Sequence, residues 1–409
     1  MVILARTLEG ALRRAQRTFP VILVTGPRQS GKTTLLRHLY GRTHRFVSLE
    51  NPSVRERARG DPEGFMRMNP SPVIFDEIQY APDLLSYIKT EVDERRTPGR
   101  YLLTGSQQLA LMQGVSQSLA GRVAVLTLLP FSVGEAMGQP DRDLAISGLL
   151  SASAKKGGGR HPGAPRTLGD WLLRGGFPEP RTRRGVDLVT WCASYVQTYL
   201  ERDVRSLVNV GDLETFGRFL RLCAARTAQL LNLSDLARDT GVSVPTARAW
   251  LSVLEATHAV FLLTPYHRNP SKRLVKAPKL YFVDTALAAF LIGLRDERSL
   301  LEGPSAGPLF ETAVVAGWRK AFLHRGDLTG LSFWRTRDGD EVDLIIESGG
   351  RTWPIEIKAT STPLPGHAVP VRKWLDAHGN RDGKGFIAAN ISAPMALLPG
   401  VKAMPWYWI

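Results

Sequence analysis

The sequence predicts an α/β protein of three compact units: an amino-terminal unit with a mostly parallel sheet, a helical middle region with a winged-helix pattern, and a carboxyl-terminal α/β unit. Two observations predict this class. Over the first third of the chain, short apolar segments rich in Val, Leu and Ile alternate with segments of helical periodicity, which is typical of parallel strands with helices on both faces. Beyond it, a long helical region is followed by a helix and three strands. The 409 residues also exceed one ordinary core.

The composition is that of a globular protein with a strong positive charge. Hydrophobic residues make up 43% and charged residues 22%, which excludes a disordered or fibrous chain. The 53 Lys and Arg residues outnumber the 38 Asp and Glu residues, and the net charge of +15 favours a polyanionic partner. Two cysteines, Cys192 and Cys223, cannot cross-link a chain of this size, and no apolar run approaches the roughly 18–20 residues that span a bilayer. We therefore expect a cytoplasmic protein with no membrane partner.

The order of the expected elements divides the chain into domains. In the first unit we expect helices at residues 32–40 and 83–95, and strands at 21–25, 46–49, 73–75, 101–104 and 123–128. Residues 151–166 are rich in Gly, Pro, Ser and cations and predict a flexible linker. Residues 187–225 have helical periodicity, and later strands are expected at 331–335, 341–346 and 353–357. The expected domains are therefore 1–140, 141–225, 226–295 and 296–409.

A phosphate-binding loop stands between the first predicted strand and the first helix after it. Residues 26–33 have the sequence GPRQSGKT, which matches the pattern GxxxxGK[ST]. In this pattern the glycines let backbone N–H groups surround the phosphates, Lys32 reaches the β and γ oxygens, and the Thr33 hydroxyl serves Mg²⁺. The predicted nucleotide-binding residues are Gly26, Pro27, Arg28, Gln29, Ser30, Gly31, Lys32, Thr33 and Thr34.

A pair of carboxylates follows the third predicted strand. Asp76 and Glu77 end the apolar run Val-Ile-Phe. Hydrolysis of a nucleoside triphosphate needs a carboxylate in the coordination shell of Mg²⁺ and a base for the attacking water. The sequence predicts that Asp76 has the first role and that Glu77 has the second.

Two further positions are candidates for contact with the γ-phosphate. Thr104 ends the next strand and Ser106 follows it. A residue at this edge would sense the γ-phosphate, and the alternative is a simple polar turn. Arg122 is a candidate finger to the nucleotide of a neighbouring subunit, with an ordinary solvated arginine as the alternative. Together with Lys32 and Glu77, Thr104 and Arg122 complete the predicted catalytic set.

These motifs resemble the AAA+ ATPases of the archaeal-ATPase type, in which an AAA_14 domain precedes a DUF4143 region. The similarity includes Ser-Leu-Glu at 48–50, Leu-Ala-Gly-Arg at 119–122, Pro-Phe-Ser-Val-Gly-Glu at 130–135, Gly-Gly-Phe-Pro at 175–178 and Tyr-Leu-Glu-Arg-Asp at 199–203. It covers nearly the whole chain, with residues 151–166 as an insertion. The resemblance implies hydrolysis of ATP with Mg²⁺, coupling of hydrolysis to movement, and a homo-oligomer such as a hexameric ring or a smaller assembly.

A helix-turn-helix pattern lies at residues 230–258. Ser234 is the expected cap of a short helix that stops at Gly241, and Ser243 is the expected cap of a longer helix. The longer helix turns three apolar side chains inward, those of Ala247, Leu251 and Leu254. A short helix, a glycine turn and a longer helix form the helix-turn-helix layout.

A basic loop follows this pattern and would form the wing of a winged helix. The cations expected to contact DNA are Arg248 on the second helix and, in the loop, Arg268, Lys272, Arg273 and Lys276. Beyond Thr246 and Arg248 the second helix has few polar side chains, so we expect DNA binding without sequence specificity. The alternative is a winged helix that serves as a packing or oligomerisation module.

Three carboxylates and a lysine are expected to converge in the last domain. Glu311 lies on a predicted helix, Asp343 lies on a strand, and Glu356 and Lys358 share one face of the next strand. Carboxylate oxygens suit Mg²⁺ or Mn²⁺, and a lysine beside the metal would position an attacking water. The alternative is that these charges are surface residues at strand ends.

The same set is similar to the PD-(D/E)xK nuclease superfamily, particularly its members that resemble Holliday-junction resolvases. The resemblance implies that Asp343, Glu356 and Lys358 form the motif core and that Glu311 is the helix acid. A site of this kind would cleave DNA with a metal, or bind DNA without cutting it.

Together, the sequence predicts a P-loop ATPase that binds and remodels DNA, with branched junctions as candidate substrates and a metal-dependent nuclease as a candidate last domain. The alternative is a nucleotide-dependent switch or scaffold that binds a partner protein and has a catalytically silent carboxyl-terminal domain.

Overall fold

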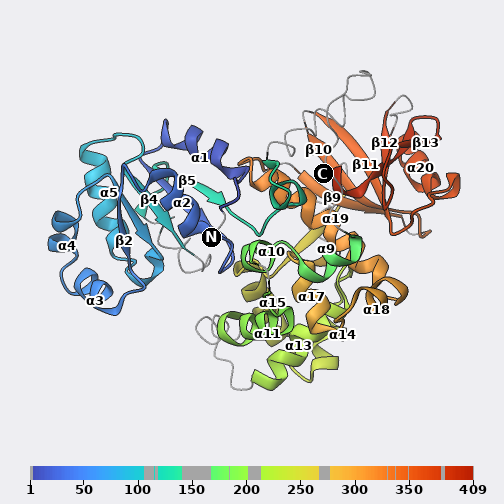
Figure 1. The fold of residues 1–409 in the computed structure, drawn as a ribbon, viewed down its shortest axis with the longest axis horizontal. Helices are drawn as coiled ribbons and strands as arrows, with labels where there is room; N and C mark the ends of the chain where they lie inside the picture. Colours follow the sequence, from blue (N-terminus) through green and yellow to red (C-terminus); the bar gives the residue numbers. More distant parts are fainter. Residues whose placement is uncertain are drawn as a thin grey trace.

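A five-stranded parallel sheet forms the centre of the amino-terminal domain (Figure 1). Its order is β2-β3-β4-β1-β5, with β1 at Val21–Thr25, β2 at Arg45–Ser48, β3 at Val73–Asp76, β4 at Tyr101–Thr104 and β5 at Val123–Thr127. The computed structural model describes residues 3–105, 115, 118–140, 167–183, 185–200, 213–266, 277–328, 330–336, 338–348, 350–378 and 383–408. The five strands lie within two residues of their predicted positions, so the predicted α/β class is confirmed.

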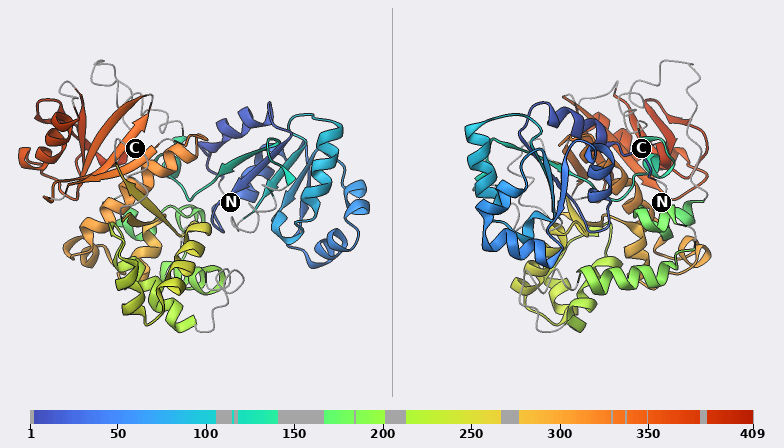
Figure 2. Two further views of the ribbon diagram at one scale, coloured as in Figure 1. Left: turned by 180° about the vertical axis from the view of Figure 1, so that it is seen from behind. Right: turned by 60° about the vertical axis from the view of Figure 1, so that its left-hand side comes forward.

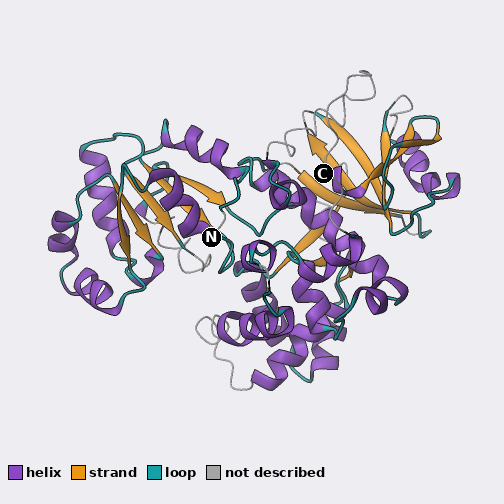
Figure 3. Cartoon of the chain, in the orientation of Figure 1, coloured by secondary structure: helices purple, strands orange, loops and turns teal. Residues whose placement is uncertain are grey.

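Helices cover both faces of this sheet (Figure 3). Ile22 and Val24 of β1 are buried in one apolar cluster with α1 (Leu8–Gln16) and α2 (Lys32–Tyr40). Their neighbours Val21 and Leu23 are buried in a second cluster with α3 (Pro52–Gly60), α4 (Pro62–Met68) and α5 (Leu84–Glu94). Successive strand residues point to opposite faces, so a strand buried on both sides must be apolar throughout. The short η1 (Ile78–Tyr80) follows β3.

The middle region contains the helices and strands of a winged helix in the expected order. After α7 (Val133–Ala136), α9 (Leu168–Arg174), α10 (Pro178–Thr182), α11 (Leu188–Tyr195) and the π-helical η3 (Val196–Leu200), the chain forms α13 (Leu213–Ala225) and β6 (Gln229–Leu230). Next come α14 (Leu233–Thr240), α15 (Val244–Ala256), β7 (Val260–Pro265) and β8 (Lys279–Phe282). The predicted linker at 151–166 and residues 267–276 of the predicted basic loop at 267–278 lie outside the described residues.

The caps of α14 and α15 are partly as predicted. Ser243 caps α15, and its hydroxyl accepts a hydrogen bond from Thr246 N at 3.2 Å. The predicted cap of α14, Ser234, is wrong: the cap is Asn232, whose side-chain oxygen accepts from the backbone N–H groups of Ser234 and Asp235. The helix therefore begins at Leu233, and Ser234 lies inside its first turn, where its own N–H is one of the groups that need a cap.

The carboxyl-terminal unit continues the sheet of the winged helix. The helices after β8 are α17 (Thr285–Leu291), α18 (Glu297–Glu302), α19 (Ala306–Leu323) and α20 (Val369–Ala377), with the short η4 (Pro365–Ala368) and η5 (Trp406–Trp408). The strands of this unit are β9 (Gly330–Arg335), β10 (Glu341–Ser348), β11 (Arg351–Lys358), β12 (Gly385–Ala389), β13 (Met395–Leu398) and β14 (Val401–Pro405). The nine-stranded order β13-β14-β12-β11-β10-β9-β7-β8-β6 joins both units in one sheet.

One strand pair makes this connection. β7 lies parallel to β9, with Thr264 opposite Ser332 and Pro265 opposite Phe333. The buried cluster around this pair extends from Leu129 to Tyr407. The winged helix and the last domain therefore share one core, and Figure 2 shows the amino-terminal domain beside the body that they form. No helix among the described residues has the length and apolar character that a membrane span requires.

Candidate nucleotide site and carboxylate cluster

The loop between β1 and α2 has the backbone conformation that the glycines permit. Gly26 has φ of 140°, and a Cβ at this position would lie 2.1 Å from the carbonyl oxygen of Leu128. Gly31 has φ of 96° and forms the left-handed cap of α2. Both conformations exclude ordinary side chains, so the loop closes tightly and its N–H groups precede a helix amino terminus. This geometry suits a phosphate group.

Lys32 is the cation of this loop. Its side chain is only 4% exposed, and its ammonium donates to the carbonyl oxygens of Gly26 at 3.0 Å and Pro27 at 2.9 Å. These carbonyls belong to the loop itself, so the ammonium lies where a phosphate bound by the loop would meet it. Ser30, also in the loop, is fully buried, and its hydroxyl oxygen has no hydrogen-bond partner.

Asp76, at the end of β3, connects β4 and the first turn of α2. Its Oδ1 accepts from the Thr33 hydroxyl at 2.6 Å and from the Thr104 hydroxyl at 2.7 Å. The strands β3, β4 and β1 are neighbours and parallel, so the residues at their carboxyl ends meet at one edge of the sheet. Burial raises the pKa of Asp76, while the two hydroxyl donors oppose the rise. A threonine hydroxyl beside a carboxylate is the donor set that P-loop proteins use for Mg²⁺, so these residues fit that ion.

Thr104 holds the Asp76 carboxylate through this hydrogen bond. Its oxygen also accepts from the backbone N–H of Glu77 at 2.9 Å, so one hydroxyl fixes both members of the Asp-Glu pair. The structure thus gives Thr104 a positioning contact, and its predicted role at the γ-phosphate stays a prediction. Ser106 lies outside the described residues.

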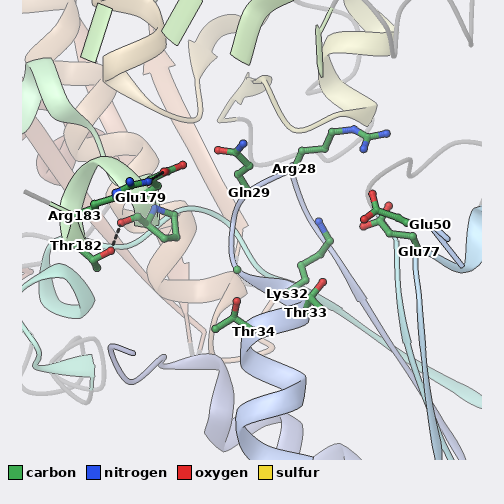
Figure 4. Close-up of a pocket in the computed structure, with 12 residues that line it drawn as sticks. Arg28, Gln29, Lys32, Thr33, Thr34, Glu50, Glu77, Glu179, Thr182 and Arg183 are labelled. Carbon is green, nitrogen blue, oxygen red and sulfur yellow. Dashed lines mark hydrogen bonds and ion pairs between the residues drawn. The ribbon is translucent and has the colours of Figure 1, made fainter. Parts of the chain in front are cut away.

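Glu77 turns out of the line of β3 into the cavity. Its backbone is left-handed, with φ of 58° and ψ of 54°, a conformation that is uncommon for residues with a side chain and that concentrates at functional sites. The side-chain amide of Gln79 donates to its carboxylate. Figure 4 shows the carboxylate of Glu50 beside that of Glu77. The sequence indicated Glu50 only as part of a family motif. Its position two residues after β2 places it at the same edge of the sheet.

The cavity has a second wall that the sequence did not predict. It encloses about 710 Å³ and is lined from the first domain by Arg28, Gln29, Gly31, Lys32, Thr33, Thr34, Glu50 and Glu77. The opposite side comes from the middle region and consists of Pro178, Glu179, Thr182 and Arg183 (Figure 4). The only sequence signal for this wall is the marker Gly-Gly-Phe-Pro at 175–178. The candidate nucleotide site therefore lies between two domains.

Arg122 lies far from the loop of its own chain. It precedes β5, and its carbonyl accepts from Val21 N at the start of β1. Its guanidinium forms a paired contact with Asp93, with distances of 2.5 Å and 2.9 Å. The phosphate loop follows the carboxyl end of β1, so Arg122 belongs to the opposite edge of the sheet. Its role as a finger to a neighbouring subunit stays a prediction.

The predicted DNA-binding cations are described only in part. Arg248 is exposed on α15, on the same face as Pro245 and Ser252. Arg268, Lys272, Arg273 and Lys276 lie outside the described residues.

Two of the three predicted carboxylates of the last domain, Glu311 and Asp343, meet at a lysine that the sequence did not indicate, together with Glu341. The ammonium of Lys279 on β8 lies 2.8 Å from Glu311 Oε1, 2.5 Å from Glu341 Oε1 and 3.5 Å from Asp343 Oδ1. Lys358 pairs with Glu356 at 2.5 Å. Burial, together with the charge of Asp343, raises the pKa of both Glu311 and Glu356.

This arrangement does not meet the expectation of a metal site. Within the described parts of the chain, no group of three or more His, Cys, Asp or Glu side chains is placed to hold a metal ion. Lys279 occupies the space among Glu311, Glu341 and Asp343, and Asp343 also accepts from the backbone N–H of Ile357 at 2.9 Å. These donors use oxygens of Glu311, Glu341 and Asp343, whereas Glu356 Oε2 is buried and has no hydrogen-bond partner among the described residues.

Comparison with known proteins gives matches over most of the chain. Residues 18–137 match the family model described as AAA domain, residues 306–409 match "Domain of unknown function (DUF4143)", and residues 165–298 match "Domain of unknown function (DUF8612)". The uncharacterized proteins Mb2031c of Mycobacterium bovis and Rv2008c of Mycobacterium tuberculosis are each 34% identical to this chain over 366 residues, which is 89% of this chain and 76% of theirs.

Two solved structures show weaker similarity. The Walker-type ATPase PABY2304 of Pyrococcus abyssi is 16% identical, with a TM-score of 0.45, and the match covers 71% of this chain and 96% of that one. The RuvB Holliday junction branch migration motor of Thermotoga maritima is 18% identical, with a TM-score of 0.29, over 64% of this chain and 86% of that one. Similarity at TM-scores below 0.5 says nothing about what this chain does.

Proposed function

Because this chain belongs to the AAA-domain family of P-loop proteins with a DUF4143 domain at the carboxyl end, we propose that it hydrolyses ATP in the cavity between its first two domains. One observation carries the proposal. Asp76 accepts hydrogen bonds from the hydroxyls of Thr33 and Thr104. Thr33 lines the same cavity as the buried Lys32 and as Glu77. These are the groups that bind phosphate, hold Mg²⁺ and activate water, and the fold brings them to one sheet edge.

Each residue then has a defined part in the reaction. The loop N–H groups and Lys32 hold the phosphates, and Thr33 with Asp76 would hold Mg²⁺, which supplies positive charge at the phosphate oxygens. The oxygen of water attacks the γ-phosphorus, its proton passes to the Glu77 carboxylate, and the bond from the γ-phosphorus to the ADP oxygen breaks. Gln79 holds the Glu77 carboxylate in place. Glu179 and Arg183 face the same cavity, so the middle region would shift when a nucleotide binds or leaves the site.

The first experiment separates binding from catalysis. We expect Lys32→Ala to abolish both binding of a fluorescent ATP analogue and phosphate release. We expect Glu77→Gln to keep the binding and to lower turnover about 10²-fold or more, which is the usual effect of losing a general base. Lys402→Ala, an exposed lysine on β14, is the matched control. Full turnover in Lys32→Ala would place the site elsewhere.

DNA is the partner that we propose for this ATPase. The support is the net charge of +15 and the winged-helix order of α13 to β8, which exposes Arg248. The test measures ATP turnover and binding with four-way junction DNA and with duplex DNA at several salt concentrations. We expect DNA to raise turnover and Arg248→Ala to weaken binding and reduce its salt dependence. Unchanged turnover with both DNAs would contradict the proposal.

A second candidate function is a nucleotide-dependent switch that binds a partner protein. The contacts of Lys279 favour it, because two of the carboxylates that metal-dependent cleavage of a phosphodiester would need already pair with this ammonium. Under this alternative, ATP would change the affinity for the partner protein while DNA would leave turnover unchanged. Assembly into a homo-oligomer is part of both candidates, and sedimentation with and without ATP tests it.

A further inference from the structure

A buried lysine stands at the boundary between the winged helix and the last domain. Lys279 is the first residue of β8, and its side chain is 4% exposed. Its three acidic neighbours come from the last domain, Glu311 from α19 and both Glu341 and Asp343 from β10. A buried ammonium is costly unless several acceptors surround it. The lysine and its carboxylates therefore depend on each other.

The remaining acceptor positions of these carboxylates are also largely occupied. Glu311 Oε1 accepts from the Tyr281 hydroxyl at 2.5 Å as well as from Lys279. Glu341 Oε2 lies 3.2 Å from the Arg335 guanidinium. The Lys279 nitrogen lies within 3.5 Å of an oxygen from each of Glu311, Glu341 and Asp343. The ammonium is thus held from three sides.

A divalent cation would need the same volume. Ca²⁺ or Mg²⁺ lies about 2.0–2.6 Å from several oxygens, contributed by more than one carboxylate. The nitrogen of Lys279 already lies 2.5–3.5 Å from oxygens of three carboxylates. A metal and this ammonium cannot both occupy the centre of the cluster, since their charges repel and their contacts overlap.

We propose that Lys279 takes the place of a divalent cation in this cluster, so that the site is an internal ion-pair junction between the winged helix and the last domain and is not a metal centre. The junction holds β8 against α19 and β10 at the point where the nine-stranded sheet passes from one unit to the other. This proposal does not depend on the ATPase activity, so failure of one leaves the other standing.

The test is a Mn²⁺ titration of the full chain by calorimetry without nucleotide, comparing the parent with Lys279→Met, which keeps the length of the side chain and removes its charge. We expect the parent and Asp343→Asn to bind Mn²⁺ equally. We expect Lys279→Met to gain a Mn²⁺ site at least about tenfold tighter than any in the parent, since a repelling charge has gone. Adding Asp343→Asn to that variant should abolish the new site. Lys402→Met is the control on the same sheet.

Two outcomes would overturn the proposal. One is Mn²⁺ binding, or Mn²⁺-dependent cleavage of junction DNA, that the parent shows and Asp343→Asn loses. The other is a folded Lys279→Met variant that gains no Mn²⁺ site. Thermal unfolding covers the case in which this variant folds poorly: Mn²⁺ should then raise its melting temperature and leave that of Lys279→Arg unchanged. No rise in the melting temperature of Lys279→Met would also contradict the proposal.

Discussion

At the scale of single residues, the candidate site depends on a few side chains with two functions each. Thr104 donates to Asp76 and accepts from the backbone of Glu77, so one hydroxyl positions the carboxylate for Mg²⁺ and the carboxylate for water. It is fully buried.

Thr104→Val should therefore lower turnover more than it lowers ATP affinity. The variant keeps the shape of the side chain but leaves the Glu77 N–H without an acceptor, which costs about 1–3 kcal/mol of stability. Thr104→Ser retains the hydroxyl and should restore turnover. Steady-state phosphate release gives kcat and KM separately, and equal loss of activity in both variants would contradict the positioning role.

Another residue-scale prediction concerns His258, which follows α15. Burial, with the nearby charge of Arg319, lowers the pKa of His258 from 6.5 to about 3. The unfolded chain then binds a proton as the pH falls below 6.5, while the folded protein does not until about pH 3. The stability contributed by neutral His258 is thus present above pH 6.5 and declines between pH 6.5 and 3, by at most about 1.4 kcal/mol per pH unit.

His258→Asn should reduce this pH dependence. Asparagine tolerates the left-handed backbone at this position, where φ is 56°, and does not titrate. Urea unfolding of the parent and the variant from pH 7 down to pH 4 measures the slope. The same change at His38, which is exposed on α2, is the control. Equal slopes in parent and variant would contradict burial as the cause.

At the scale of secondary-structure elements, the start of α14 shows how local chemistry fixes a boundary. Both Asn232 and Ser234 are good caps, and only the position of the first helical residue decides between them. We predict that Asn232→Ala lowers the free energy of unfolding by about 0.5–2 kcal/mol. Ser234→Ala should change it by a few tenths, because that hydroxyl is exposed and caps nothing. Chemical denaturation measures both values, and the reverse order would restore the cap expected from the sequence.

At the scale of the whole molecule, one arginine connects the nucleotide site to the last domain. Arg6 donates to Ser30 O of the phosphate loop at 2.9 Å and to Leu129 O at 2.7 Å, and it pairs with the buried Glu135 at 3.2 Å. His324, which caps the carboxyl end of α19, lies 3.1 Å from the same carboxylate. Burial alone would raise the pKa of Glu135, but the charges of Arg6 and His324 lower it. These contacts form a continuous chain from the phosphate loop to the end of α19.

Arg6→Met should weaken the connection between the amino-terminal domain and α19. It leaves the Glu135 carboxylate buried without its main cation, which typically costs about 3–5 kcal/mol. It also frees Ser30 O, so ATP affinity should fall. Arg13→Met, at an exposed position of α1, is the control. Calorimetric unfolding and nucleotide binding measure the two effects, and a variant that matches the control in both would rule out this connection.

The sequence by itself determined what depends on neighbouring residues. The phosphate loop, the pair Asp76 and Glu77, the parallel strands of the first domain and the winged-helix order all follow from short motifs and from periodicity. The convergence of Glu311, Asp343 and Glu356 was also predicted, because alternation along strands fixes the face of each residue.

Only the tertiary structure decided what these elements meet. The parallel pairing of β7 with β9, the wall that Glu179 and Arg183 add to the nucleotide cavity, and the place of Lys279 among the carboxylates join segments far apart in the chain. Contacts of this kind leave no periodic signal in the sequence, because they depend on how complete elements pack. For Lys279 that packing changed the chemistry, since a buried ammonium now stands where the motif predicted a metal.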